Sequence, residues 1–184
     1  MSLSDDLATL EEWLRRRAPV SYASLRPPAS PSRVAEVADV FGHPLHVELA
    51  ELLYWHDGTT NLPDESLQIA PDFGFIGLSD ALSEWQLRCA GDSSALQDHP
   101  LMSWSPNWFP FGLDWCGGVI VLNHDQSRAG YGNVFATEPE QGSRRAEGWN
   151  SVTSLVRDVL ESLHSGQARR DYQPVVDEGV LTWQ

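Results

Sequence analysis

Hydrophobic and polar positions recur with a helical period in the N-terminal part of the chain. The first predicted helix covers residues 4–17, and Ser2 with Asp5 forms a capping box at its start. Arginines in its last turn suit the negative end of the helix dipole, and Pro19 ends the helix. The leucines that we expect to face the core are Leu3, Leu7, Leu10 and Leu14.

Two further helices are predicted before a turn at Asp57 and Gly58. Ser30 is a suitable N-cap for the first of them, and Gly42 is suited to its C-terminal end. The second helix is expected to begin at Pro44. The inward positions of the two helices are expected to be Val34, Val37, Val40, Phe41, Leu45, Leu49, Leu52 and Leu53.

The pattern changes to short apolar runs in the middle of the chain. Strands are predicted over residues 67–70 and 73–76, and a helix capped by Ser79 follows them. The apolar run at residues 119–122 is typical of a central strand. An extended aromatic segment at residues 108–112 precedes this run. After the run, a glycine-containing hairpin loop at residues 125–132 leads to a further strand at residues 133–137.

The chain closes with a helix predicted over residues 152–164, which Asn150 or Ser151 caps and Gly166 ends. The tail then forms either a hairpin, with its turn at residues 177–179, or an unpaired arm. Helices, then strands around one more helix, then a closing helix indicate the α+β class rather than alternating β and α units.

Chain length and element order together predict the domain organisation. A chain of 184 residues is long enough for one domain with its own hydrophobic core. We expect this domain over residues 1–165, followed by a C-terminal extension over residues 166–184.

The charge balance restricts the class of partner. The chain carries 26 acidic and 12 basic residues, a net charge of −14, and every basic residue is an arginine. Such a chain should repel nucleic acids and anionic membranes, and it suits a basic protein partner. An acidic surface that serves only solubility explains the same charge balance, and from the charge alone we favour it. The arginine usage suggests a GC-rich bacterium, and the acidic N-terminus and absence of a long apolar run predict a cytoplasmic protein.

One cysteine has the surroundings of a possible nucleophile. Cys116 precedes Gly117 and Gly118, whose N–H groups suit an oxyanion hole, and His124 follows as a candidate base. A bend that leads into the strand at residues 119–122 explains the same glycines, and we favour it. We therefore predict no catalytic residues.

Neither metal sites nor disulfides are predicted from the histidines and cysteines. His43 and His46 form an HxxH pair without the glutamate of a zinc protease, and two His-Asp dipeptides lie at element ends where turn chemistry explains them. We predict no metal and no cofactor. Cys89 and Cys116 are expected to be reduced and at least partly buried.

Aromatic residues crowd the segment between residues 104 and 115. Most should belong to the core, but one or two are expected to be partly exposed beside acidic residues, where tryptophan commonly anchors a protein interface. The candidate partner-binding residues are Trp108, Asp114, Trp115, His124 and Asp125.

Three segments in a fixed order carry a family resemblance. The first runs from Leu-Arg-Pro-Pro-Ala-Ser at residues 25–30 to a helix that ends in His-Asp-Gly at residues 56–58. The second is Trp-Phe-Pro-Phe-Gly at residues 108–112 with the strand and loop that follow, and the third is the closing helix after residues 149–151. Together they resemble the SUKH superfamily, specifically its Smi/Knr cell-wall regulator family.

The resemblance implies a curved, mostly antiparallel sheet flanked by N-terminal helices and a closing C-terminal helix. The family has no established catalytic residues. Many bacterial members look like immunity proteins that neutralise toxin domains, often nucleases, whereas fungal members act as regulatory hubs in cell-wall synthesis. We expect a non-enzymatic, intracellular protein of the immunity type, with a basic toxin as partner. A regulatory or scaffold module is the alternative, followed by an uncharacterised hydrolase.

Overall fold

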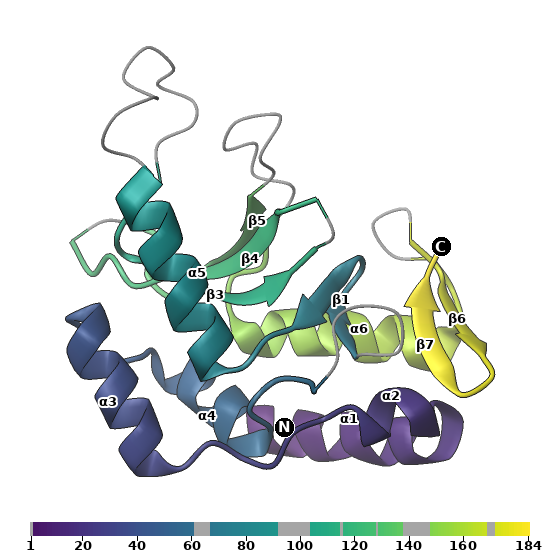
Figure 1. The fold of residues 1–184 in the computed structure, drawn as a ribbon. Helices are drawn as coiled ribbons and strands as arrows, with labels where there is room; N and C mark the ends of the chain where they lie inside the picture. Colours follow the sequence, from purple (N-terminus) through teal and green to yellow (C-terminus); the bar gives the residue numbers. More distant parts are fainter. Residues whose placement is uncertain are drawn as a thin grey trace.

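A curled antiparallel sheet lies against helices from both ends of the chain in the computed structural model (Figure 1). The structure describes residues 2–60, 67–91, 104–114, 116–127, 129–137, 148–168 and 172–184. The elements, in order, are α1 (Leu3–Arg17), α2 (Pro19–Ala23), α3 (Pro31–Phe41), α4 (Val47–Trp55), β1 (Gln68–Ala70), β2 (Phe73–Phe75), α5 (Leu78–Gly91), β3 (Trp108–Leu113), β4 (Val119–Asn123), β5 (Val134–Thr137), α6 (Val152–Ser165), β6 (Pro174–Asp177) and β7 (Val180–Trp183).

The N-terminal helices begin and end where local capping chemistry predicts. Ser2 and Asp5 form the capping box of α1, and Ser30 accepts the Arg33 N–H at the start of α3. Gly42 ends α3 in the left-handed conformation, with φ of +84°. These three predictions are confirmed.

Two details of α3 and α4 differ from the predictions. Val40 does not face the core, because its side chain is 52% exposed. Helix α4 begins at Val47 rather than at Pro44, because His46 acts as the N-cap. Its Nδ1 accepts the Glu48 N–H over 3.3 Å, which satisfies one of the unpaired donors of the first turn.

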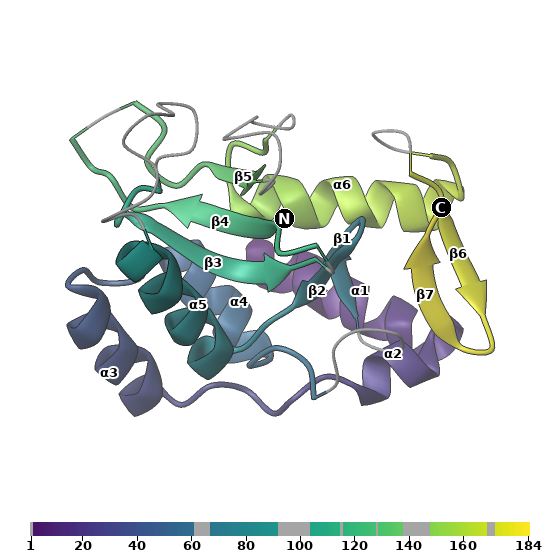
Figure 2. The same ribbon diagram turned by 45° about the horizontal axis from the view of Figure 1, so that its top comes forward.

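The main sheet is a meander in the order β1-β2-β3-β4-β5, with every neighbouring pair antiparallel (Figure 2). The predicted central strand is β4, which lies between β3 and β5. A register shift between Pro110 and Gly112 places one extra residue on β3 and pairs Leu113 with Val119. Such a bulge bends the strand and increases its twist, which contributes to the curl of the sheet.

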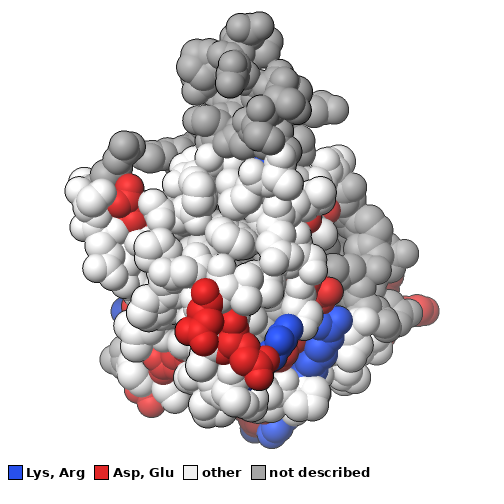
Figure 3. All heavy atoms as spheres, turned by 60° about the vertical axis from the view of Figure 1, so that its left-hand side comes forward, with Lys and Arg blue, Asp and Glu red and all other residues white. Residues whose placement is uncertain are grey.

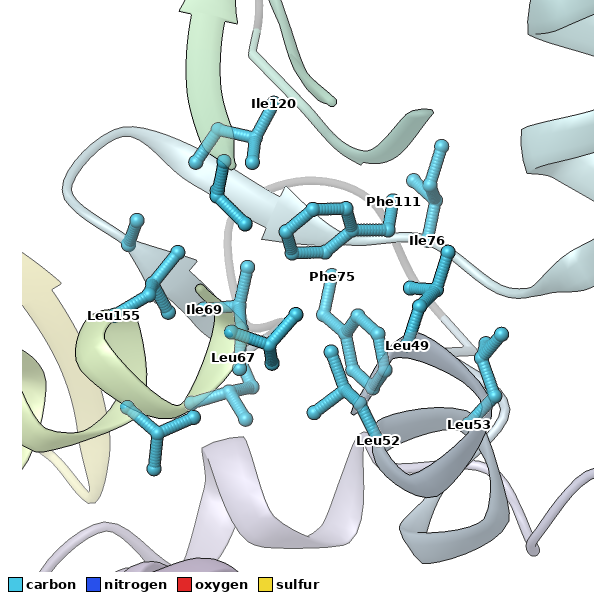
Figure 4. Packing of buried hydrophobic residues seen from close by; sticks show 14 of the residues in the cluster. Leu49, Leu52, Leu53, Leu67, Ile69, Phe75, Ile76, Phe111, Ile120 and Leu155 are labelled. Carbon is cyan, nitrogen blue, oxygen red and sulfur yellow. The ribbon is translucent and has the colours of Figure 1, made fainter. Parts of the chain in front are cut away.

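The two faces of the sheet pack against different partners. Figure 4 shows Phe75 and Phe111 of the inner face beside leucines of α4, with Leu155 of α6 closing the cluster. A smaller buried cluster of Val119, Val121 and Phe135 covers the outer face, with Trp104, Trp108 and Leu113 packed against it. Burial on both faces explains the uninterrupted apolar run of β4.

Helix α5 has a cap that comes from elsewhere in the chain. Ser79 was predicted as the N-cap, but the helix already begins at Leu78. The Leu78 N–H donates to Asp57 Oδ1 over 2.7 Å, so the turn after α4 caps α5. The two turns touch so closely that a Cβ on Gly58 would lie 2.1 Å from the Gly77 nitrogen.

The closing helix and the tail complete the core. Ser151 caps α6 with a capping box, and β6 and β7 form an antiparallel hairpin rather than an unpaired arm. The buried Leu181 joins the main core cluster, and its N–H donates to Ser21 Oγ of α2 over 2.9 Å. The domain boundary at residue 165 stays a prediction.

The observed architecture is that of a single α+β domain with a curled, antiparallel sheet, as predicted. Helices α1, α4 and α6 pack on one another and on the inner face of the sheet (Figures 1 and 2). Within the described ranges, no helix has both the length and the apolar composition that crossing a membrane requires.

Candidate protein-binding face

His124 connects the end of β4 to the loop between α3 and α4 by a hydrogen bond. Its Nε2 accepts the His46 N–H over 2.9 Å, so the ring proton is on Nδ1, which donates to the Leu122 carbonyl over 3.1 Å. The ring packs edge-on against Phe41 and Phe109, with centroid distances of 4.9 and 6.3 Å. These contacts place the β4–β5 loop directly beside the C-terminal end of α3.

Burial lowers the pKa of His124 to about 4, and the neighbouring histidines act in the same direction. The ring is therefore neutral at pH 7, as its role as a hydrogen-bond acceptor requires. Burial also lowers the pKa of His46. Neither ring is placed to act as a cation toward a partner at neutral pH.

A groove of about 520 Å³ lies between α3 and α4. Its lining is mainly apolar and includes Val34, Ala38, Asp39, Leu45, Ala50 and Tyr54. We call this groove, together with the exposed residues of α4 and of the β4–β5 loop beside it, the α3–α4 face.

Exposed apolar side chains border the groove. Val47 is 72% exposed and Tyr54 is 42% exposed, and their spacing along α4 places them on the same side as Ala50 of the groove lining. Tyr131 of the β4–β5 loop is 41% exposed and packs edge-on against the His46 ring, 5.0 Å between centroids. Exposed apolar and aromatic groups gathered beside a groove are typical of a protein-binding surface.

The charge on the α3–α4 face is negative. Asp39 is exposed at the edge of the groove, and Glu51 lies on the same side of α4 as Val47 and Tyr54. Neither carboxylate forms an ion pair with any residue that the structure describes. Figure 3 shows the side of the molecule where α3 lies, with a cluster of acidic side chains, fewer basic ones, and a largely uncharged surface above them.

The residues predicted to bind a partner are divided between the two ends of β3 and β4. Trp108 pairs with Asn123 across the strands, so it lies at the same end of the sheet as His124 and Asp125. Asp114 lies at the opposite end, in the β3–β4 turn. Trp115 lies outside the described residues.

These side chains differ in what they offer a partner. Trp108 is half-buried, in edge contact with Trp104 and Phe135. His124 is only 3% exposed, so a partner reaches it only if the loops around it move. The Asp125 carboxylate accepts hydrogen bonds from the N–H and hydroxyl of Ser127, which order the start of the β4–β5 loop.

The groups of the possible cysteine site do not converge. Cys116 and His124 lie beyond opposite ends of β4, a strand of 5 residues that is about 16 Å long at roughly 3.3 Å per residue. The N–H groups of Cys116 and Gly118 donate to Asp114 Oδ1 over 2.8 and 2.6 Å, so neither points into an oxyanion hole. The two cysteines, both in the described part of the chain, do not form a disulfide. Cys89 is half-buried as expected, but Cys116 is exposed, because the turn holds it on the outside.

The histidines do not form a metal site in the described part of the chain, where no group of three potential ligands comes together. His43 is exposed and packs against the Phe41 ring, whereas Nδ1 of His46 caps α4. In the His-Asp dipeptide at residues 56–57, the aspartate caps α5. The turn and capping roles of these residues explain the sequence pattern.

A sequence model of the SMI1 / KNR4 family (SUKH-1) matches residues 28–158, well over half of the chain. The chain belongs to the SMI1 / KNR4 family. A comparison with curated proteins gave no match. The family is generally a non-enzymatic immunity or regulatory domain that binds protein partners, which supports a protein-binding role for this member. The α3–α4 face lies entirely within the matched residues.

The sequence contains a signal for the α3–α4 face that the sequence-based interpretation missed. Val47 and Tyr54 lie seven residues apart in α4, on the side opposite to the buried leucines of that helix. Apolar residues on the polar side of an amphipathic helix indicate a contact beyond the chain's own core. The groove itself depends on how α3 and α4 pack together, and that packing is not visible in the spacing of either helix.

Proposed function

We propose that this SMI1 / KNR4 protein is an immunity-type protein that binds and neutralises a basic toxin domain through its α3–α4 face. The observation that carries the proposal is the apolar groove bordered by exposed Tyr54, with Asp39 and Glu51 beside it, whose carboxylates form no ion pair with a described residue. Neutralisation by binding is stoichiometric and requires no catalytic group.

The chemistry of the face suits a partner with an apolar anchor and cations around it. Tyr54 and Val47 offer rigid apolar contact area, which supplies most of the affinity of a typical interface. Asp39 at the edge of the groove, and Glu51 on the same side of α4 as Tyr54, are positioned to pair with arginine or lysine side chains around that anchor. A nuclease domain meets this description, because its nucleic-acid surface is basic.

The predicted partner-binding residues at the near end of the sheet extend the proposed surface. Asp125 begins the loop that carries Tyr131, and Trp108 lies on the neighbouring strand. We propose that a large partner that covers the α3–α4 face also reaches this loop, with Asp125 adding to the negative charge. Asp114 belongs to the far end of β3 and β4, and the proposal depends neither on it nor on Trp115, which lies outside the described residues.

The test begins with partner capture in the organism that encodes the chain, followed by expression of each captured basic protein alone and together with the chain. We expect one of them to arrest growth when expressed alone, and co-expression of the chain to restore growth. Tyr54→Ala and Asp39→Arg should each weaken the rescue. Val40→Ala and Glu178→Arg are the matched controls, because they change exposed residues away from the groove.

Two outcomes contradict the proposal. If the chain fails to rescue growth from any captured protein, the immunity role is wrong. If rescue occurs but the Tyr54 and Asp39 variants rescue as well as the two controls do, the toxin binds elsewhere. A regulatory or scaffold role is the second candidate, and family membership favours it equally; it predicts a captured partner that is harmless when expressed alone.

A further inference from the structure

A second and larger groove lies at the other end of the molecule. Its volume is about 880 Å³, and residues of α1, of the C-terminal end of α6 and of β6 line it. Figure 1 shows α3 and the β6–β7 hairpin at opposite ends of the fold, so this groove is well separated from the α3–α4 face. We call it the α1–hairpin groove.

The α1–hairpin groove lies outside the part of the chain that matches the family. Its lining residues all precede residue 28 or follow residue 158, the limits of the family match. The shared protein-binding role of the family therefore does not account for it. A function for this groove goes beyond the function proposed above and involves different residues.

Apolar side chains, an arginine and a histidine meet in this groove. Half-buried Trp13 and the buried Leu163 contribute apolar surface, and Val176 of β6 adds a side chain that is 41% exposed. Arg17 and His164, from the last turns of α1 and α6, lie beside them. A carboxylate with an apolar neighbour matches this combination of an apolar surface and a cationic edge.

Arg17 has an unusual position in this acidic chain. In the described ranges, each other arginine pairs with a carboxylate; these are Arg15, Arg16, Arg26, Arg33, Arg88 and Arg157. Arg17 is exposed and forms no ion pair with a described residue. Glu12, the acidic residue of the lining, is already paired with Arg16. The guanidinium of Arg17 is thus available to a carboxylate from outside.

We infer that the α1–hairpin groove binds a short acidic segment of a partner protein. An apolar side chain of that segment packs against Trp13 and Val176, and an adjacent carboxylate pairs with Arg17. The guanidinium group favours carboxylates because its paired N–H donors match their two oxygens. The chain as a whole has a net charge of −14 and repels an acidic segment. The charge complementarity is therefore confined to the groove, where Arg17 provides the cation.

The same charge balance favours a short peptide segment over a nucleic acid. Charges at an exposed site interact over a screening length of about 8 Å at physiological ionic strength. The carboxylates of a short segment in the groove therefore interact mainly with the charges of the groove, and only weakly with the acidic residues on the rest of the molecule. A nucleic acid carries one charge for about every 1.7 Å of duplex, and it would extend over the surrounding acidic surface.

The test uses the full chain labelled with ¹⁵N and follows the indole N–H resonance of Trp13, identified by its loss in Trp13→Phe. The probe is a synthetic peptide about three helical turns long, built of glutamate and leucine at helical spacing. The control peptide has glutamine in place of every glutamate. We expect the acidic peptide to shift the Trp13 resonance saturably and the glutamine peptide to bind roughly fivefold more weakly, the value of one good exposed ion pair.

Variants of the chain locate the binding. Arg17→Gln should weaken binding of the acidic peptide by a similar factor of about five, and Val176→Asp should abolish the shift of the Trp13 resonance. Arg33→Gln and Val47→Asp are the matched controls on the far side of the molecule and should leave binding unchanged. Thermal unfolding of each variant verifies that it is folded.

Each of three results would overturn the inference. The first is a Trp13 resonance that does not respond to the acidic peptide. The second is a glutamine peptide that binds as tightly as the acidic one, which removes the role of charge. The third is a Trp13 resonance that shifts with protein concentration alone and loses this shift in Arg17→Gln, which means that a second copy of the chain occupies the groove. None of these results affects the growth test of the α3–α4 face.

Discussion

At the scale of single residues, several polar side chains join segments that are far apart in the sequence. His124 joins β4 to the α3–α4 loop, and Asp57 joins the end of α4 to the start of α5. Glu48 accepts both the N–H and the hydroxyl of Thr153, over 3.1 and 2.8 Å, at the start of α6. Each acceptor satisfies donors that would otherwise be unpaired at partly buried element ends, and such losses cost about 1–3 kcal/mol.

Burial of the His124 ring lowers its pKa and so makes the stability of the fold depend on pH. The pKa of this histidine is about 4 in the folded protein, against an ordinary value of 6.5. Because folding lowers the pKa, the neutral ring stabilises the fold fully above about pH 6.5, and this contribution is lost as the pH falls toward 4. The loss should approach about 3 kcal/mol. Urea unfolding of wild type and His124→Gln between pH 7 and about 4.5 measures this loss. If the free energy of unfolding of the two proteins changes equally with pH, His124 is not the group responsible.

Two glycines with similar backbone angles should tolerate alanine very differently. Gly42 and Gly58 both have positive φ, +84° and +72°, so alanine at either position costs about 1 kcal/mol of backbone strain. A Cβ at Gly42 meets nothing within 4 Å, whereas one at Gly58 would collide with the backbone at Gly77. We expect Gly58→Ala to destabilise the protein by about 2 kcal/mol more than Gly42→Ala. Chemical denaturation of both variants provides the comparison, and equal losses would contradict the close approach.

At the scale of elements, the caps divide into those that the sequence predicted and those that it did not. Ser2, Ser30 and Ser151 lie beside the helices that they cap, so their spacing in the sequence is sufficient. The cap of α5 comes from Asp57, 21 residues before Leu78, and only the folded chain brings the two together. The α3–α4 face was missed for the same reason, since it depends on the packing of two helices.

The C-terminal hairpin should behave as part of the core. The side chain of Leu181 is fully buried against the main cluster, so Leu181→Ala should cost about 2–4 kcal/mol. Val176→Ala on the exposed side of the same hairpin should cost less than about 0.5 kcal/mol. Both values come from equilibrium unfolding monitored by circular dichroism. A loss below about 1 kcal/mol for Leu181→Ala would mean that the hairpin detaches without disturbing the core.

At the scale of the whole molecule, the negative charge should govern how fast a basic partner arrives. Long-range attraction raises association rates, and salt screens it, so the association rate constant should fall at least about tenfold between low and physiological ionic strength. Tyr54→Ala should instead raise the dissociation rate, because its contact forms only in the complex. Stopped-flow measurements with the captured partner separate the two effects. A salt-independent association rate would rule out electrostatic steering.

The packing of α1 against α6 links residues from the two ends of the chain. The Asp6 carboxylate, almost fully buried, accepts a hydrogen bond from Arg157 Nε over 2.7 Å, and the buried leucines of α1 belong to the same core cluster as those of α6. The stretch that the family model matches stops at residue 158, and it excludes α1 and the end of α6. A fragment trimmed to those limits would leave part of its interior open to water and should aggregate, so the minimal folding unit of this protein should be larger than the stretch that the family model matches.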